Sequence, residues 1–194
     1  MTWYTFFKSL HVVAATIWVG GAAMTQAYAL RIVRSRDARR IAAFAKDTEV
    51  VSMRLFIPAT WVLLLAAIGM MVNGDLGWGQ NWIVLGLVSW ALSFAIGAGF
   101  LGPESGRIAK VVESEGPESP VAQARIRRIL LVSRCELVVL IAVVVNMVVK
   151  PVGNAGWFWG ILAAMALGIA AVVAVHSSSS SRTAAPATRS PSAT

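Results

Sequence analysis

Five long apolar stretches dominate this sequence of 194 residues. They cover residues 3–30, 55–72, 82–101, 129–149 and 157–175. A helix rises about 1.5 Å per residue, so each stretch is long enough to cross about 30 Å of hydrocarbon, the second being near the lower limit. In lipid a chain must satisfy its own backbone hydrogen bonds, which runs of this length do as helices. We therefore expect an all-α, polytopic membrane protein with five transmembrane helices.

The composition agrees with a membrane protein and excludes several other classes. Hydrophobic residues make up 57% of the chain and charged residues only 13%, whereas about a quarter of a soluble domain is charged. Cys135 is the only cysteine, which excludes an intrachain disulfide and a zinc site built from cysteine pairs. The net charge of +8 lies between the apolar stretches, a pattern typical of membrane topology and not of nucleic-acid binding.

The positive charges predict how the chain is oriented. Seven Lys and Arg residues fall within residues 31–54 and five within 107–128, whereas the connection 73–81 has none and the next has only Lys150. By the positive-inside rule the two basic segments are cytoplasmic, which places the N-terminus outside and the C-terminus inside. Tryptophans fall at the predicted outer ends, as in an aromatic belt: Trp78, Trp82, Trp157 and Trp159.

We expect a single transmembrane domain over residues 1–176, with a four-helix core and a peripheral fifth helix. Residues 177–194 are rich in Ser, Thr, Ala and Pro, which predicts a disordered cytoplasmic tail. The Ala27-Tyr28-Ala29 segment resembles a signal-peptide cleavage site, but residues 1–7 carry no basic side chain, so we expect no cleavage. The basic 31–54 segment has helical spacing. It either lies on anionic lipid or forms a cytoplasmic helical connection with a solvated face.

Polar side chains inside a membrane helix are costly and mark candidate sites. In the first stretch, Lys8 and His11 are three residues apart and share a face with Trp18. His11 has three possible roles: it makes a structural polar contact, it is a ligand of haem iron or another metal, or it handles protons or substrate. His176, the only other histidine, lies at the opposite end of the fifth stretch. A second haem ligand would therefore come from another residue: Met24, Met70, Lys8 or His11 of a second copy.

The fourth stretch carries three further candidates, Arg134, Glu136 and Asn146. Arg134 fits the cytoplasmic headgroup level. Glu136 lies deeper and is the better functional candidate, although a structural ion pair with a loop arginine is the leading explanation for it. No nucleotide-binding, serine-hydrolase or zinc-protease motif occurs in a suitable context, so an enzymatic role is the less favoured reading.

Short motifs give the sequence a family resemblance. The first stretch contains Lys8-Ser9-Leu10-His11, then Trp18 and Gly20-Gly21. It resembles the opening helix of small bacterial membrane proteins that include the copper resistance D family and the haem-associated membrane protoporphyrinogen oxidases. An uncharacterised family of predicted integral membrane proteins (domain of unknown function twenty-two sixty-nine) belongs to the same group. Three further motifs look most like this last family, over residues 5–152: Pro58, Leu101-Gly102-Pro103 and Val149-Lys150-Pro151.

The resemblance implies a candidate haem or metal ligand at His11, with Lys8 and Trp18 beside it. The Asn-Glu-x-Pro element and the second histidine of the oxidases are missing, because Cys135-Glu136-Leu137-Val138 stands at the first position. We expect a small multi-pass protein of the bacterial inner membrane, acting as a subunit or helper in the bilayer. It would pair with itself or with other membrane subunits. Two alternatives are a haem b-binding redox protein with His11 as axial ligand and a small transporter.

Overall fold

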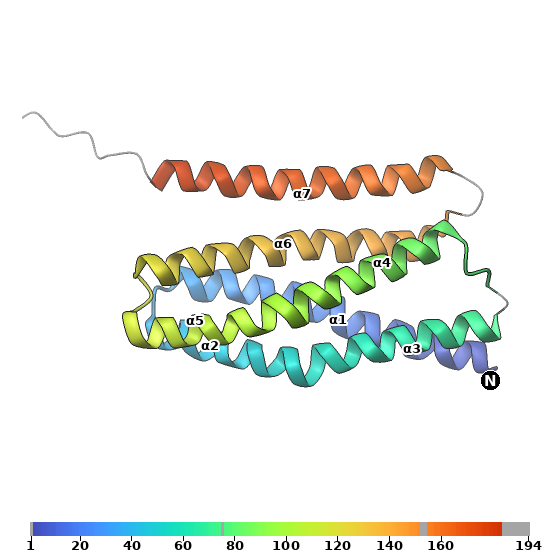
Figure 1. Ribbon diagram of the computed structural model, residues 1–194, viewed down its shortest axis with the longest axis horizontal. Helices are drawn as coiled ribbons and strands as arrows, with labels where there is room; N and C mark the ends of the chain where they lie inside the picture. The colour runs from blue at the N-terminus through green and yellow to red at the C-terminus, as the bar shows by residue number, and fades with distance from the viewer. Residues whose placement is uncertain (1, 75, 152–154, 184–194) are drawn as a thin grey trace, which may run out of the picture.

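The computed structural model describes residues 2–74, 76–151 and 155–183, and this part of the chain is helical and without strands (Figure 1). Within these described residues, seven α-helices and two π-helical turns follow one another. Their bounds are α1 Trp3–Arg34, α2 Ala38–Val51, η1 Ser52–Phe56, α3 Ile57–Asn73, α4 Asn81–Ile96, η2 Gly97–Leu101, α5 Gly102–Glu115, α6 Pro120–Val149 and α7 Ala155–Thr183.

The expected five membrane-spanning helices are confirmed. The π-turns join α2 to α3 and α4 to α5 without a break, which leaves five long rods, each apolar enough to cross a bilayer. Two rods are longer than the apolar stretches predicted, since Ala38–Asn73 has 36 residues and Asn81–Glu115 has 35. The hydropathy falls where these rods extend past the apolar stretches, but the helical hydrogen bonding continues.

Capping residues set where the rods begin and end. The Asp37 carboxylate accepts hydrogen bonds from the backbone N–H groups of Arg39 and Arg40 and so begins α2. Ser119 caps α6 in the same way, with Pro120 at the first helical position. Gly116 ends α5 with a φ of 84°, a left-handed conformation that glycine adopts without steric cost.

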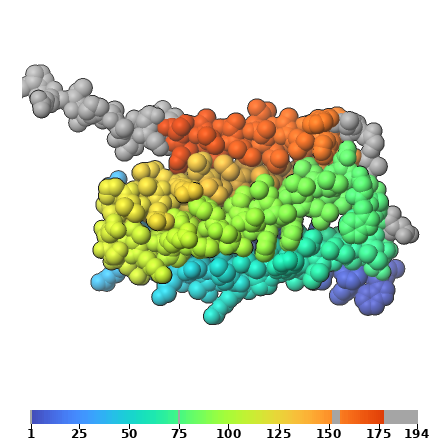
Figure 2. Space-filling model, viewed as in Figure 1, coloured from blue at the N-terminus to red at the C-terminus, as the bar shows by residue number. Residues whose placement is uncertain are grey.

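The four-helix core and the peripheral fifth helix are also confirmed. In the core, α1 packs along α3 and α4 packs along α6, while α7 lies against α6 at the edge of the bundle (Figures 1 and 2). Gly168 of α7 allows this approach, because a Cβ there would lie 2.7 Å from the Val138 side chain. The helix continues to Thr183. Most of the predicted disordered tail lies outside the described residues.

At one end of the bundle α2 and α5 lie side by side, and we call this end the basic end. A small separate apolar core fills it. It joins the last turns of α1, both of these helices and the start of α6, and its central members are Ile32, Ile41, Ala45, Ile108, Val112, Ala122 and Ile126. The apolar face of α2 is therefore buried against α5, while Arg39, Arg40 and Lys46 are exposed. Of the two readings of the 31–54 segment, the structure favours the helical connection with a solvated face.

Candidate functional site

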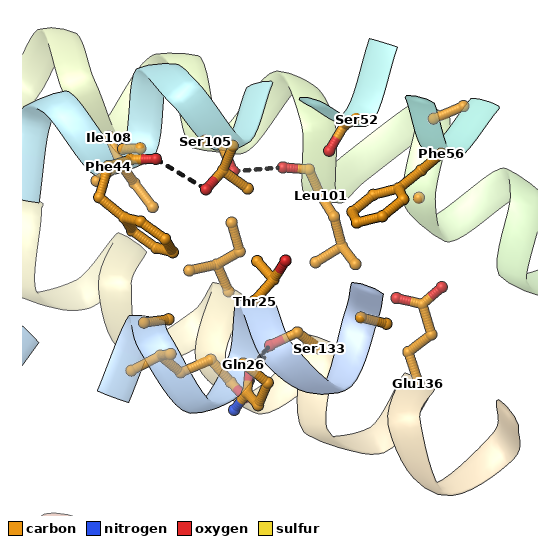
Figure 3. A pocket seen from close by; sticks show the side chains of 18 of the residues that line it. Thr25, Gln26, Phe44, Ser52, Phe56, Leu101, Ser105, Ile108, Ser133 and Glu136 are labelled. Atoms are coloured by element: carbon orange, nitrogen blue, oxygen red, sulfur yellow. Dashed lines mark hydrogen bonds between the residues drawn. The ribbon is translucent and has the colours of Figure 1, made fainter. Parts of the chain in front are cut away.

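A cavity of about 150 Å³ lies inside the bundle, between α1, the two π-turns and α6, and extends toward the basic end (Figure 3). Most of its wall is apolar, including Trp18, Phe44, Phe56 and Leu101. The polar side chains in the wall are Thr25, Gln26, Thr48, Ser52, Thr60, Ser93, Ser105, Ser133 and Glu136. An apolar cavity with a few polar groups is the usual form of a site for a small organic ligand.

The two π-turns form one wall of the cavity. In η1 the Ile57 N–H bonds to the Ser52 carbonyl, and in η2 the Gly102 N–H bonds to the Gly97 carbonyl, each five residues back. The turns contact each other, and a Cβ at Gly102 would lie 3.6 Å from the Ser52 side chain. Turns of this kind inside α-helices are frequent at functional sites.

A proline follows each π-turn at the same distance. Pro58 comes two residues after η1, and Pro103 comes two residues after η2. Proline lacks an N–H, and its ring clashes with the carbonyl four residues earlier in an α-helix. Those carbonyls belong to Arg54 and Gly99, which both lie inside the π-turns. The wider backbone of each turn moves the carbonyl aside, so the rod continues through the proline.

Phe56 shows how the first π-turn shapes the cavity. Its ring lies against α1 at Gly21, where a Cβ would come within 2.5 Å of the ring. Any larger side chain at position 21 would displace the ring. The glycine therefore keeps this part of the wall in place.

Glu136 is the charged residue among those that line the cavity. Its side chain comes from α6 and reaches toward the space beside Phe56 and Leu101 (Figure 3). The residue is only 8% exposed, and no hydrogen bond or ion pair joins its carboxyl to another side chain in the described part of the chain. The ion pair with a loop arginine that the sequence suggested is absent there, because Arg107 and Arg125 bind a different carboxylate.

That other carboxylate belongs to Glu104, which is 3% exposed at the basic end. Its two oxygens accept hydrogen bonds from Arg125, at 2.7 Å, and from Arg107, at 3.3 Å. Sequence reasoning missed this cluster because Glu104 and Arg125 are far apart in the chain. It ties α5 to the first turns of α6.

Gln26 and Ser133 join α1 to α6 in the floor of the cavity. The Ser133 hydroxyl donates to the Gln26 side-chain oxygen at 2.6 Å (Figure 3). The nitrogen of the same amide is buried and lacks a partner among the described residues. Thr25, the neighbour of Gln26, points into the centre of the cavity (Figure 3).

The three residues singled out in the first stretch have different environments. His11 is half-buried, and its Nδ1 lies 3.0 Å from the Leu63 carbonyl oxygen of α3. Lys8 is exposed. Only Trp18 lines the cavity, with 8% of its surface exposed. The structure therefore does not gather them into one site.

Asn146 lies away from the cavity, fully buried between α6 and α4. It donates from Nδ2 to the Trp82 carbonyl oxygen at 2.8 Å, and Lys150 lies over the Trp82 ring at 5.3 Å. Arg134 is half-buried, with no hydrogen bond or ion pair to a described residue. Of the candidates in the fourth stretch, only Glu136 reaches the cavity.

His11 lies where α1 and α3 pack closely together. Its ring is hydrogen-bonded to the backbone of α3, and one turn away the Phe7 ring packs directly on Gly69, so α1 and α3 are in close contact at this level. No group of three or more His, Cys, Asp or Glu side chains that could hold a metal occurs within residues 2–74, 76–151 and 155–183. The cavity wall begins at Trp18 and does not include His11.

The comparisons with known proteins identify a family. The family described as predicted integral membrane protein (DUF2269) matches residues 5–151, which span α1 to α6. No curated protein and no solved structure matches the chain significantly. The chain thus belongs to this family of predicted integral membrane proteins, as its motifs indicated, and it is a multi-pass protein of the lipid bilayer. Its similarity to the copper resistance D proteins stays a prediction.

Proposed function

We propose that this member of the family is a non-catalytic helper protein that binds one small lipid-soluble molecule inside its helical bundle. The observation that carries the proposal is the cavity of about 150 Å³ between α1, η1, η2 and α6. An engineered apolar protein cavity of about this size binds benzene. Ligands of that kind reach such a site from the bilayer.

Two hydroxyl groups in the wall support binding over chemistry. The Thr48 hydroxyl donates to the Phe44 carbonyl at 2.8 Å, and the Ser105 hydroxyl donates to the Leu101 carbonyl at 2.9 Å. A hydroxyl that donates to the backbone of its own helix is not activated by a neighbouring base, as a nucleophile must be. These groups shape and polarise the wall without being poised to react.

Binding of a neutral aromatic probe tests the proposal. The protein is placed in nanodiscs of phosphatidylcholine, and the fluorine NMR signal of para-fluorotoluene is compared with that in empty nanodiscs. We expect broadening with the wild type and with the lipid-facing control Val13→Leu, a residue that is 56% exposed. Thr25→Leu fills the centre of the cavity and should abolish the broadening. A signal that is the same in empty discs, or equally broad with Thr25→Leu, would refute the proposal.

The cell location and partners are part of the same proposal. The cluster of Arg and Lys at the basic end favours a cytoplasmic position for that end in a bacterial inner membrane, with the N-terminus outside. Self-association, or pairing with other membrane subunits, stays a prediction. Native mass spectrometry of the complex released from nanodiscs measures it directly.

Haem b binding and transport are the two alternative roles. The haem hypothesis rests on His11, and absorption spectra of oxidised and reduced protein test it. A Soret band that is lost in His11→Ala would favour it over the proposed function. A transport role requires the cavity to open to both faces of the membrane in turn. Labelling of cysteines introduced into the cavity wall, from each side of sealed vesicles, tests that requirement.

A further inference from the structure

We infer that the ligand of the cavity is a small lipophilic amine, and that the Glu136 carboxylate binds its ammonium group. The inference rests on the proposed function, because it names the chemical class of the molecule that the cavity holds. Neither the family description nor the resemblance of the motifs assigns such a ligand.

The position of Glu136 carries the argument. It is 92% buried, it faces the cavity, and no cation of the described chain forms an ion pair with it. A buried carboxylate without a partner is strongly unfavourable, whereas one that is paired and hydrogen-bonded is tolerated. A protonated amine in the cavity would supply the missing charge.

The arginines nearest to Glu136 in the sequence either contact other residues or do not face Glu136. Arg125 binds Glu104, and Arg128 lies over the Phe100 ring at 5.0 Å. Arg134 is two positions from Glu136 on the same helix, and side chains two positions apart do not face each other. The acid is therefore left for a ligand.

Aromatic rings complete the site for a cation. Phe56 and Trp18 both line the cavity, on the wall formed by η1 and α1. The face of an aromatic ring attracts an ammonium group, most strongly when both are removed from water. The same rings and the aliphatic wall bind the apolar body of the ligand. One acid, aromatic walls and limited volume together favour an arylalkyl amine over a neutral molecule.

The size of the cavity selects the probes. Para-fluorobenzylamine is close to the benzene-sized ligand that about 150 Å³ accommodates. Para-fluorobenzyl alcohol has nearly the same shape but no charge. Comparing the two separates the need for a cation from the need for an aromatic ring with a hydrogen-bonding group.

The experiment measures both affinities by fluorine NMR titration, with wild-type protein and variants in phosphatidylcholine nanodiscs and with empty discs subtracted. Glu136→Gln keeps the shape of the side chain and removes its charge. Glu113→Gln makes the same change at an exposed position of α5 and serves as the matched control. Thr25→Leu fills the cavity, so any probe binding that remains in this variant takes place outside it.

We expect Glu136→Gln to weaken amine binding by about tenfold or more, a change that corresponds to about 1.4 kcal/mol. Alcohol binding should change by less than about threefold, which also shows that the variant is folded, and Glu113→Gln should resemble the wild type. If Glu136→Gln leaves amine binding unchanged, or the wild type binds only the alcohol, the inference is wrong and the proposed function survives. If neither probe nor para-fluorotoluene binds the wild type, both are wrong.

Discussion

Replacing Arg125 by methionine tests the ion-pair cluster at the basic end. Arg125 lies 2.7 Å from the Glu104 carboxylate, whose side chain is only 4% exposed. Methionine fills much of the same space and removes the charge. The variant therefore leaves a buried carboxylate that has lost its shorter ion pair.

The expected loss of stability follows from the geometry. Two unit charges about 4 Å apart interact by about 4 kcal/mol at an effective dielectric constant of about 20. The Arg125 side chain is 36% exposed, so water screens part of this energy, and Arg107 still contacts the carboxylate at 3.3 Å. We therefore expect the free energy of unfolding to fall by about 2 kcal/mol, less than the 3–5 kcal/mol typical of breaking a fully buried pair.

The assay is unfolding by SDS in mixed micelles, followed by tryptophan fluorescence. Arg127→Met is the matched control, because Arg127 is an exposed residue of the same helix and should change stability by less than about 0.5 kcal/mol. The double variant with Glu104→Met should recover part of the loss, since it removes the stranded charge. Equal effects of Arg125→Met and Arg127→Met would refute the reasoning.

Two further predictions concern helix packing and are measured by the same unfolding assay. Gly69→Ala would place a Cβ 2.6 Å from the Phe7 ring and should destabilise the protein by about 1–3 kcal/mol. In the control Gly20→Ala the new Cβ meets no atom within 4 Å, so this variant should be neutral or stabilising. A larger loss of stability in Gly20→Ala than in Gly69→Ala would contradict the α1–α3 contact. Asn146→Ala removes the hydrogen bond to the Trp82 carbonyl and should lower stability by about 1–2 kcal/mol, and no loss would mean that this contact does not join α6 to α4.

The membrane architecture could be predicted from the sequence because it depends on local composition. Runs of apolar residues long enough to cross a bilayer indicate spanning helices wherever they occur. The fifth helix could be placed at the edge for a related reason: it is apolar throughout and carries no acidic or basic side chain between Trp157 and Val175. The family resemblance rested on short motifs in the first four stretches, and the family match confirms it over nearly the same residues.

The cavity could not be predicted, because residues from six α-helices and both π-turns meet there only after folding. Pro58 and Pro103 were visible in the sequence, but only as parts of the motifs that carry the family resemblance. Within one continuous rod the same prolines are accommodated by π-turns. The two prolines could have pointed to the π-turns, because each lies two residues after one of them. Only the contact between η1 and η2 shows that both turns face the same cavity.

The polar candidates were ranked by depth in the membrane, and depth alone does not say what a side chain faces. His11 and Asn146 contact the backbone of neighbouring helices, which is the structural role considered for such residues. Glu136 was recognised as a candidate but was matched to a loop arginine. In the structure the loop arginines Arg107 and Arg125 form ion pairs with Glu104 instead. No spacing rule along the chain predicts that Arg125 and Glu104 pair.

A crystal of the protein soaked with para-bromobenzylamine tests the central claim most directly, because anomalous scattering locates bromine without reference to the protein's own atoms. We predict one bromine peak in the cavity between α1, η1, η2 and α6, with the amine nitrogen at hydrogen-bond distance from the Glu136 carboxylate. The peak should be absent in crystals of Thr25→Leu. A peak outside the cavity, or an amine directed away from Glu136, would contradict the account.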